Sequence, residues 1–169
     1  MFERFYPKEY RESAYEIAFE KWYESGYRGI LFDIDNTLVP HGFPADDRAI
    51  ALLKKLKEIV YQIMMLSNNK EPRVKMFCDA VGIPYIYKAG KPNPAQYRAA
   101  MRKLGTDENS TLFVGDQIFT DIWGANRAGI YSILVKPINP REEIQIVLKR
   151  YLEKIVLFWY LKKTNNKGI

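Results

Sequence analysis

The residues of this chain best suited to chemistry are two aspartates one position apart, Asp33 and Asp35. They follow the apolar run 29–32, which is typical of a buried strand, and they precede Pro40. An unpaired charge is costly to bury, and the two-residue period of a strand sends both carboxylates to the same side of the chain. Such a pair indicates that a cation is bound, a proton is exchanged, or both.

Four further polar residues lie just beyond later apolar runs: Ser67, Lys91, Asp116 and Asp121. Ligands of parallel α/β sheets bind beyond the carboxyl ends of the strands, so we expect these side chains to gather there. Mg²⁺ prefers oxygen ligands and is often shared with a substrate phosphate. Asp33 and Asp116 suit it, with Asp121 as a further candidate. Ser67 and Lys91 suit a phosphoryl group, as a hydrogen-bond donor and a fixed positive charge.

These residues suit phosphoryl transfer. A carboxylate can attack phosphorus and form an aspartyl-phosphate, and Asp35 can protonate the leaving alcohol and then activate water. The order of the residues resembles the four motifs of haloacid dehalogenase (HAD) superfamily phosphatases: Asp33-x-Asp35-x-Thr37, Ser67, Lys91, and Gly115-Asp116-x4-Asp121. Residues 29–40, Ser67-Asn68-Asn69, Lys91-Pro92 and 115–121 further resemble the YqeG-type, subclass IIIA branch, which is related to phosphatidylglycerophosphate phosphatases.

The resemblance implies a role for each motif residue. Asp33 would be the nucleophile and a Mg²⁺ ligand. Asp35 would be the general acid/base, with its backbone carbonyl also a Mg²⁺ ligand. Thr37, Ser67 and the backbone of Asn68 would organise the phosphate pocket.

The later motifs would complete the site. Lys91 would hold both the phosphate and the nucleophile, and Asp116 would complete the Mg²⁺ shell, with Asp121 as the second acid of the last motif. The implied function is a Mg²⁺-dependent phosphomonoesterase, with phosphatidylglycerophosphate or another membrane-presented phosphate as substrate. Two alternatives stay open: a phosphatase of soluble nucleotides, sugar phosphates or nucleic acid ends, and a non-catalytic interaction module.

Apolar runs alternate with helical patterns along the chain. The runs 30–32, 61–66, 85–87, 111–114 and 132–135 predict strands, and helices are predicted at 45–58, 71–81, 94–104 and 119–128. This alternation favours an α/β, Rossmann-like single domain with a five-stranded parallel sheet and helices on both faces. A leading helix is predicted over 9–25, and the chain divides into a body (1–140) and a C-terminal segment (141–169).

The spacing of the motifs leaves no room for a cap domain. Asp35 and Ser67 are 32 positions apart, and Ser67 and Lys91 are 24 apart. One helix and about one strand fill each interval. We therefore expect an open pocket, with a small flap at 39–44, which suits a phosphate carried on something large.

Other interpretations of single features are weaker. A phosphorelay receiver would have its acceptor aspartate at the end of the third strand, but 85–87 lacks one and Lys91 precedes Asp116. His41 is a substrate contact or, more simply, a solvated loop residue. Cys78 is expected in the core. Asn69 and Gln117 either shape the pocket or cap helices.

Composition and length limit the number of domains and the cellular compartment that we expect. The 169 residues suit one domain, and a single cysteine excludes an internal disulfide. The start of the chain lacks a signal-peptide pattern, and no apolar run reaches the roughly 20 residues needed to cross a bilayer. A cytoplasmic protein is expected.

The C-terminal segment carries most of the positive charge. Residues 136–169 hold eight Lys or Arg and three Glu, a balance of +5 against +6 for the chain. From residue 144 the apolar residues follow a helical period. One interpretation is a helix packed on the body or on a second copy in a homo-oligomer. The other is a peripheral contact with the inner face of the membrane. No nucleic acid partner is expected, because bulky aliphatic residues separate the basic ones.

Overall fold

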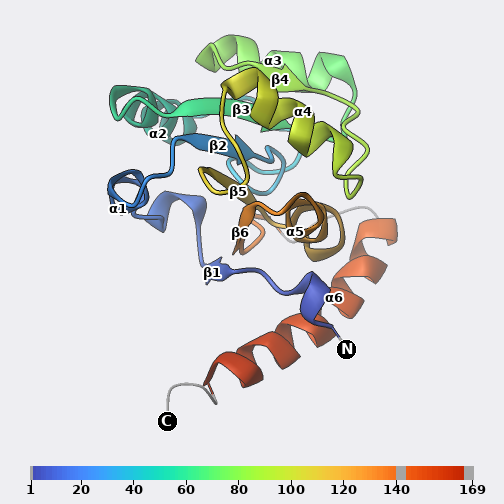
Figure 1. Cartoon of the computed structure of the whole chain (residues 1–169). Helices are drawn as coiled ribbons and strands as arrows, with labels where there is room; N and C mark the ends of the chain where they lie inside the picture. The colour runs from blue at the N-terminus through green and yellow to red at the C-terminus, as the bar shows by residue number, and fades with distance from the viewer. Residues whose placement is uncertain (1, 140–143, 166–169) are drawn as a thin grey trace.

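The computed structural model describes residues 2–139 and 144–165. Six parallel strands form one sheet in the order β1-β6-β5-β2-β3-β4. The strands are β1 (Glu9–Arg11), β2 (Gly29–Phe32), β3 (Gln62–Leu66), β4 (Tyr85–Ile86), β5 (Thr111–Gly115) and β6 (Tyr131–Val135). The helices are α1 (Phe19–Glu24), α2 (Asp47–Glu58), α3 (Glu71–Val81), α4 (Ala95–Leu104), α5 (Trp123–Ala128) and α6 (Ile144–Asn165) (Figure 1).

Helices cover both faces of the sheet because the central strands are apolar on both sides. Ile30 and Phe32 of β2 pack in one core with residues of α1, α2 and α3. Leu31, between them, points to the other face and packs in a second core with residues of α4 and α5. Cys78 is buried in the first core, as expected. Central strands buried on both faces are typical of parallel sheets.

The strand order reverses between β2 and β5. From β2 the chain builds outward through β3 to β4, and it then crosses back to place β5 on the other side of β2. The loops after β2 and β5 consequently leave the sheet in opposite directions. A crevice opens at such a switch point, where α/β proteins bind ligands. Both loops carry aspartates of the predicted motifs.

The single α/β domain with a parallel sheet and helices on both faces is confirmed, and residues 2–139 and 144–165 contain no cap domain. The sheet has six strands instead of five, and the helix predicted over 9–25 is wrong. Residues Glu9–Arg11 pair with the open edge of β6 instead, and Ser13 caps a short 3-10 turn by accepting a hydrogen bond from Tyr15. Only Phe19–Glu24 is α-helical. The helical spacing of apolar residues could not show that β6 needed a partner at its edge.

The predicted helix 119–128 is also modified. It begins as a π-helical turn at Ile118–Ile122, and α5 follows directly. A π-helical turn is wider than an α-helical one and often lies at a functional site.

Helix α6 packs along this π-helical turn. Val156 is buried with Ile118, Ile122 and Leu134, and Phe5 packs against the same cluster. None of the helices in the described ranges is long and apolar enough to cross a membrane. The expected C-terminal helix is thus present, although residues 140–143 and 166–169 of the predicted segments lie outside the described residues.

Candidate active site

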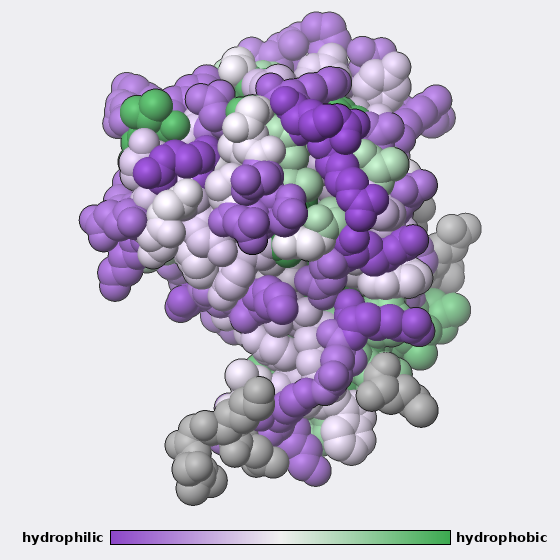
Figure 2. All heavy atoms as spheres, in the orientation of Figure 1, coloured by the Kyte–Doolittle hydropathy of each residue, from purple (hydrophilic) through white to green (hydrophobic). Residues whose placement is uncertain are grey.

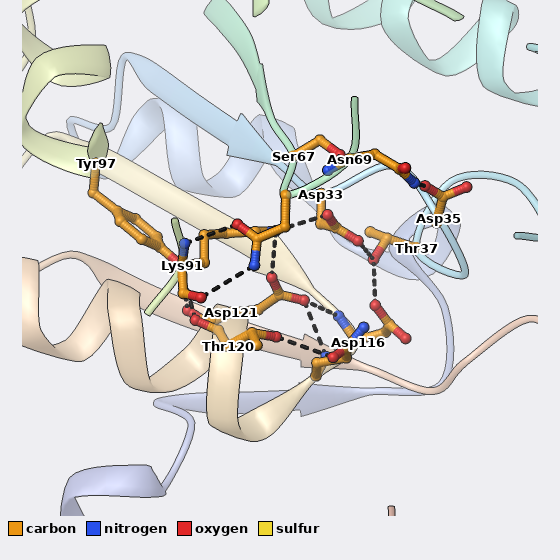
Figure 3. A network of polar contacts seen from close by, with 12 residues as sticks. Asp33, Asp35, Thr37, Ser67, Asn69, Lys91, Tyr97, Asp116, Thr120 and Asp121 are labelled. Carbon is orange, nitrogen blue, oxygen red and sulfur yellow. Dashed lines mark hydrogen bonds and ion pairs between the residues drawn. The ribbon is translucent and has the colours of Figure 1, made fainter. Parts of the chain in front are cut away.

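The predicted motif residues meet at the carboxyl edge of the sheet. Asp33 follows β2, Ser67 follows β3 and Asp116 follows β5, while Lys91 comes from the loop before α4 (Figure 3). Asp33, Ser67 and Lys91 line an open pocket of about 270 Å³, and a carboxylate oxygen of the buried Asp116 lies within 4.8 Å of one of Asp33. Its lining residues are Asp33, Asp35, Asn36, His41, Ser67, Asn68, Asn69, Lys91, Gln117, Thr120 and Lys149. The structure therefore brings the predicted motif residues together at one edge of the sheet.

Lys91 joins two of the buried carboxylates. Its Nζ lies 2.7 Å from Asp33 Oδ1 and 2.6 Å from Asp121 Oδ1. Burial favours the neutral amine, but the charges of Asp121 and Asp33 outweigh it and raise the pKa of Lys91 above its ordinary value. The side chain of Asn68 fixes the loop, because its Oδ1 accepts from the Lys91 N–H at 2.8 Å and its Nδ2 donates to the Lys91 carbonyl at 3.1 Å.

Asp33 is only 7% exposed. Burial raises its pKa to about 7, against the opposing charge of Lys91. Its second oxygen, Oδ2, is 3.5 Å from the hydroxyl of Thr37, which also lies 3.2 Å from Asp116 Oδ1. The Thr37 hydroxyl therefore contacts two carboxylates. The family resemblance had implied a role for Thr37 in the phosphate pocket.

Asp121 is held from three directions. Its Oδ2 accepts the backbone N–H groups of Asp116, at 3.1 Å, and of Gln117, at 3.0 Å, while Oδ1 accepts from Lys91. The π-helical turn makes this possible, because it carries Asp121 back beneath the end of β5. Gly115 is required for the same approach: a Cβ there would lie 2.6 Å from the Asp121 carboxyl carbon.

The three buried aspartates form a candidate metal centre. One carboxylate oxygen from each of Asp33, Asp116 and Asp121 lies within 4.8 Å of the others. An all-oxygen donor set suits a hard divalent cation such as Mg²⁺. The Asp35 carboxylate is not part of this group.

Asp35 lies at the rim of the pocket, away from the buried cluster (Figure 3). Its carboxylate accepts hydrogen bonds from the Gly42 N–H (2.8 Å), Arg73 Nη2 (2.8 Å) and Asn69 Nδ2 (3.0 Å). Burial alone would raise its pKa, but the Gly42 N–H and the Arg73 guanidinium hold that pKa below its usual value. His41 also lines the pocket, with Nδ1 4.0 Å from Asp35 Oδ1.

The flap predicted at 39–44 is a short turn tied to the motif. Asn36 takes a left-handed backbone conformation (φ 62°), which asparagine tolerates better than most residues, and its N–H donates to the Val39 carbonyl at 2.7 Å. Asn69 shapes the pocket through Asp35 and also donates its own N–H to Ser67 Oγ at 3.1 Å. Gln117 lines the pocket as well.

Sequence reasoning missed four residues at the site. Arg73 holds Asp35, Tyr97 donates to the backbone carbonyls of Thr120 and Asp121, Lys149 lines the pocket, and Arg150 contacts Asp116. Arg73 follows Asn69 by four positions and lies in the first turn of the helix predicted at 71–81, so the sequence could have suggested that its side chain lies near the pocket. Lys149 and Arg150 lie far beyond the last motif, and no local signal marks them.

The comparisons with known proteins agree with this arrangement. A sequence profile described as HAD-hydrolase-like matches residues 88–140. The "Probable phosphatase YqeG" of Bacillus subtilis is 36% identical over 154 residues, which is 90% of each chain. The chloroplastic/mitochondrial "Phosphatidylglycerophosphate phosphatase 1" of Arabidopsis thaliana is 27% identical over 158 residues, covering 87% of this chain and 45% of that protein.

A solved structure shares the fold. It is the cobalt-bound deoxy-D-mannose-octulosonate 8-phosphate phosphatase of Haemophilus influenzae, with a TM-score of 0.52 and 14% identity, covering 66% of this chain and 80% of that one.

Proposed function

Because the chain belongs to the YqeG family of HAD superfamily phosphatases, we propose that it is a Mg²⁺-dependent phosphomonoesterase that works through an aspartyl-phosphate on Asp33. The observation that carries this proposal is the buried contact between Asp33 and Lys91 beside two further carboxylates. Asp33, Asp116 and Asp121 are all buried, and a module that only binds a partner at its surface would not need three acids in its interior.

The residues present fit the proposed chemistry. Asp33 and Asp116, with Asp121 behind them, would hold the cation. When bound, the cation neutralises charge on the phosphoryl oxygens and keeps Asp33 ionised at neutral pH. Lys91 supplies a further positive charge at the same place, and Ser67 lines the pocket where the phosphoryl oxygens would lie.

The proposed reaction has two steps. Asp33 attacks phosphorus, the bond to the leaving alcohol breaks, and Asp35 gives its proton to that alcohol. Asp35 then removes a proton from water, which attacks phosphorus, releases inorganic phosphate and restores the Asp33 carboxylate. In the structure Asp35 is turned to Arg73, which lowers the pKa of Asp35 and so favours the ionised form that the second step requires. Protonation for the first step requires it to leave Arg73.

Asp33→Asn tests the mechanism. The variant keeps the shape of the side chain but loses the nucleophile, so we expect phosphate release to fall by at least about a thousandfold while the unfolding transition is retained. A phosphorylated enzyme, trapped by rapid acid quenching with ³²P-labelled substrate, should be seen for the unsubstituted chain only. Turnover of Asp33→Asn at the original rate would overturn the mechanism.

We propose a phosphate presented at a membrane as the substrate, with phosphatidylglycerophosphate as the first candidate. Three observations support it. The part of the chain that the structure describes has no cap domain over the pocket, a lysine of α6 lines the pocket, and one relative is a phosphatidylglycerophosphate phosphatase. An open pocket suits a phosphate that is carried on a large group such as a lipid.

The exposed face of α6 supports a membrane contact. It presents large apolar side chains to solvent, among them Leu148 (69% exposed), Tyr151 (64%) and Phe158 (60%). The one acid in α6, Glu153, is buried against the body, whereas Lys149, Lys154 and Lys162 are exposed. An apolar face flanked only by cations suits an anionic lipid surface. In Figure 2 hydrophobic atoms emerge beside the first turns of α6, while most of the face shown is hydrophilic. The inner face of the cytoplasmic membrane is the location that we propose.

Kinetics separate the two substrate classes. Phosphatidylglycerophosphate in anionic vesicles should be hydrolysed with a kcat/KM at least about a hundredfold above that of soluble nucleotide and sugar monophosphates, each assayed with Mg²⁺. Equal or faster hydrolysis of a soluble monoester would support the alternative reading. No hydrolysis across the whole panel would favour the non-catalytic module.

A further inference from the structure

One side chain of the C-terminal helix reaches the candidate metal centre from outside the motifs. Arg150 Nη2 lies 2.5 Å from Asp116 Oδ2, and Nη1 donates to the backbone carbonyl of Asp116 at 2.7 Å. The planar guanidinium thus holds one residue at two points. Such a two-point contact fixes orientation as well as distance, which a lysine cannot do.

The contact with Arg150 leaves the second carboxylate oxygen of Asp116, Oδ1, facing the candidate metal centre. Asp116 Oδ1 is 3.2 Å from the Thr37 hydroxyl, which in turn lies 3.5 Å from Asp33 Oδ2. Arg150 therefore takes the oxygen on the α6 side, and Oδ1 remains on the side shared with Asp33. Asp116 is almost fully buried, so without this partner its carboxylate would have an uncompensated charge.

Arg150 is itself held in place. Glu153 Oε2 accepts from Arg150 Nη1 at 3.0 Å, and Glu153 Oε1 accepts from the Phe119 N–H at 3.3 Å. Phe119 belongs to the π-helical turn that also carries Asp121. Val156, one turn further along α6, packs against Ile118 and Ile122 of the same turn. Helix α6 is thus fixed to the segment that carries both acids of the last motif.

We propose that Arg150 is a positioning residue for the metal centre: it orients the Asp116 carboxylate so that Oδ1 faces Asp33 and the cation. The inference rests on the proposed function and extends it, because it makes α6 a required part of the site. The opposite possibility is that Arg150 competes with the cation for Asp116. The two possibilities predict opposite effects on metal affinity when the guanidinium is removed.

Arg150→Lys is the decisive variant, because it keeps the positive charge and removes the two-point contact. We expect the Kd for Mg²⁺, measured by isothermal titration calorimetry without substrate, to rise about tenfold, as is common when the partner of a metal ligand is lost. Arg102→Lys, at an exposed position in the last turn of α4, is the matched control and should leave the Kd unchanged. A Kd for Arg150→Lys within twofold of the original, or a tighter one, would overturn the proposal.

Chemical rescue distinguishes positioning from a general loosening of α6. Arg150→Ala leaves a space at the site of the guanidinium, so millimolar ethylguanidinium should restore at least part of the Mg²⁺ affinity, whereas ethylammonium should restore less. Equal effects of the two cations would count against a two-point contact. If the Arg150→Ala chain does not fold, as judged by its unfolding transition, the lysine variant alone decides.

The same titration separates this inference from the function on which it rests. If the unsubstituted chain binds no Mg²⁺, both the proposed function and the inference fail. If it binds Mg²⁺ and Arg150→Lys binds it equally well, only the role of Arg150 is lost.

Discussion

Asp33 and Asp35 are one residue apart in the chain and lie in opposite surroundings. Asp33 is buried, and burial raises its pKa to about 7, whereas the Gly42 N–H and Arg73 hold the pKa of Asp35 below its usual value. The raised pKa belongs to the proposed nucleophile and the lowered one to the proposed acid, so the first step requires a cation that ionises Asp33 and an Asp35 that has left Arg73. The strand period alone places both on one side of the chain and cannot separate them.

The division of roles predicts how Asp35→Asn behaves. Because an amide cannot donate a proton to the leaving oxygen, hydrolysis of an alkyl phosphate should slow by about 10²–10⁴-fold. Hydrolysis of p-nitrophenyl phosphate, whose leaving group needs no proton, should slow much less in its first step. The two substrates are compared by kcat/KM, which reports that step. An equal loss for both substrates would show that Asp35 acts elsewhere in the reaction.

Gly115→Ala tests the close approach of the last motif to β5. The new Cβ would lie 2.6 Å from the Asp121 carboxyl carbon, so Asp121 must move away from Lys91 and from the N–H groups that hold it. We expect a loss of about 1–3 kcal/mol in the free energy of unfolding, measured by urea denaturation. Phosphatase activity should fall at least tenfold under conditions where the variant is fully folded. Unchanged activity would mean that the position of Asp121 is not critical.

At the scale of the elements, local motifs were predictable and long-range contacts were not. The β–α alternation and the glycines that end helices gave most strand and helix positions. For example, Gly82 and Gly105 end α3 and α4 in the left-handed conformation, as their places in the sequence suggested. The strand at Glu9–Arg11 escaped prediction because its stability comes from β6, which lies 124 residues away at the Lys8–Ser132 contact.

The candidate site likewise contains residues that the sequence could predict and contacts that it could not. Asp33, Lys91 and Asp116 could be placed together because each follows a strand or lies in a loop at one edge of the sheet, and Asp121 because it is only five positions after Asp116. The contact of Arg150 with Asp116 spans 34 residues and depends on how α6 packs on the π-helical turn. No periodicity within α6 distinguishes Arg150 from its other basic residues.

The position of Lys149 on helix α6 leads to a prediction about substrate binding. Lys149 lines the pocket from α6, and its charge is placed to attract an anionic substrate. Lys149→Ala should raise KM about three- to tenfold with kcat nearly unchanged, more at low ionic strength than at high. Lys54→Ala, on the exposed side of α2, is the control for loss of one positive charge. A fall in kcat without a change in KM would assign Lys149 to another step.

At the scale of the whole molecule, helix α6 contributes both to the lining of the pocket and to an exposed apolar surface. Lys149 lines the pocket, and the apolar residues 148, 151, 155 and 158 follow along the exposed side of α6. An exposed apolar surface of this kind marks an interaction site. A phosphate at a lipid surface would then lie close to where α6 enters that surface.

The double variant Ile155→Ser/Phe158→Ser tests this face. Each side chain contributes about 1.5 kcal/mol or more on leaving water, so co-sedimentation with phosphatidylglycerol-containing vesicles should weaken at least tenfold. Met76→Ser, at an exposed apolar position of α3, should sediment like the original chain. Unchanged sedimentation of the double variant would reject the membrane contact. A dimer that the double variant converts to monomer in solution would assign the face to a second copy instead.

The pairing of β1 with β6 has a consequence for the order in which parts of the protein fold during synthesis. Residues Glu9–Arg11 are synthesised more than a hundred residues before the strand that they pair with, and Gly29–Phe32 are synthesised about eighty residues before Thr111–Gly115. Contacts of such sequence separation form late. Asp33 and Asp35, which follow β2, therefore stay apart from Asp116 until β5 has been synthesised, and Arg150 is added later still. A nascent chain would therefore complete the proposed site only after residue 150 has been synthesised.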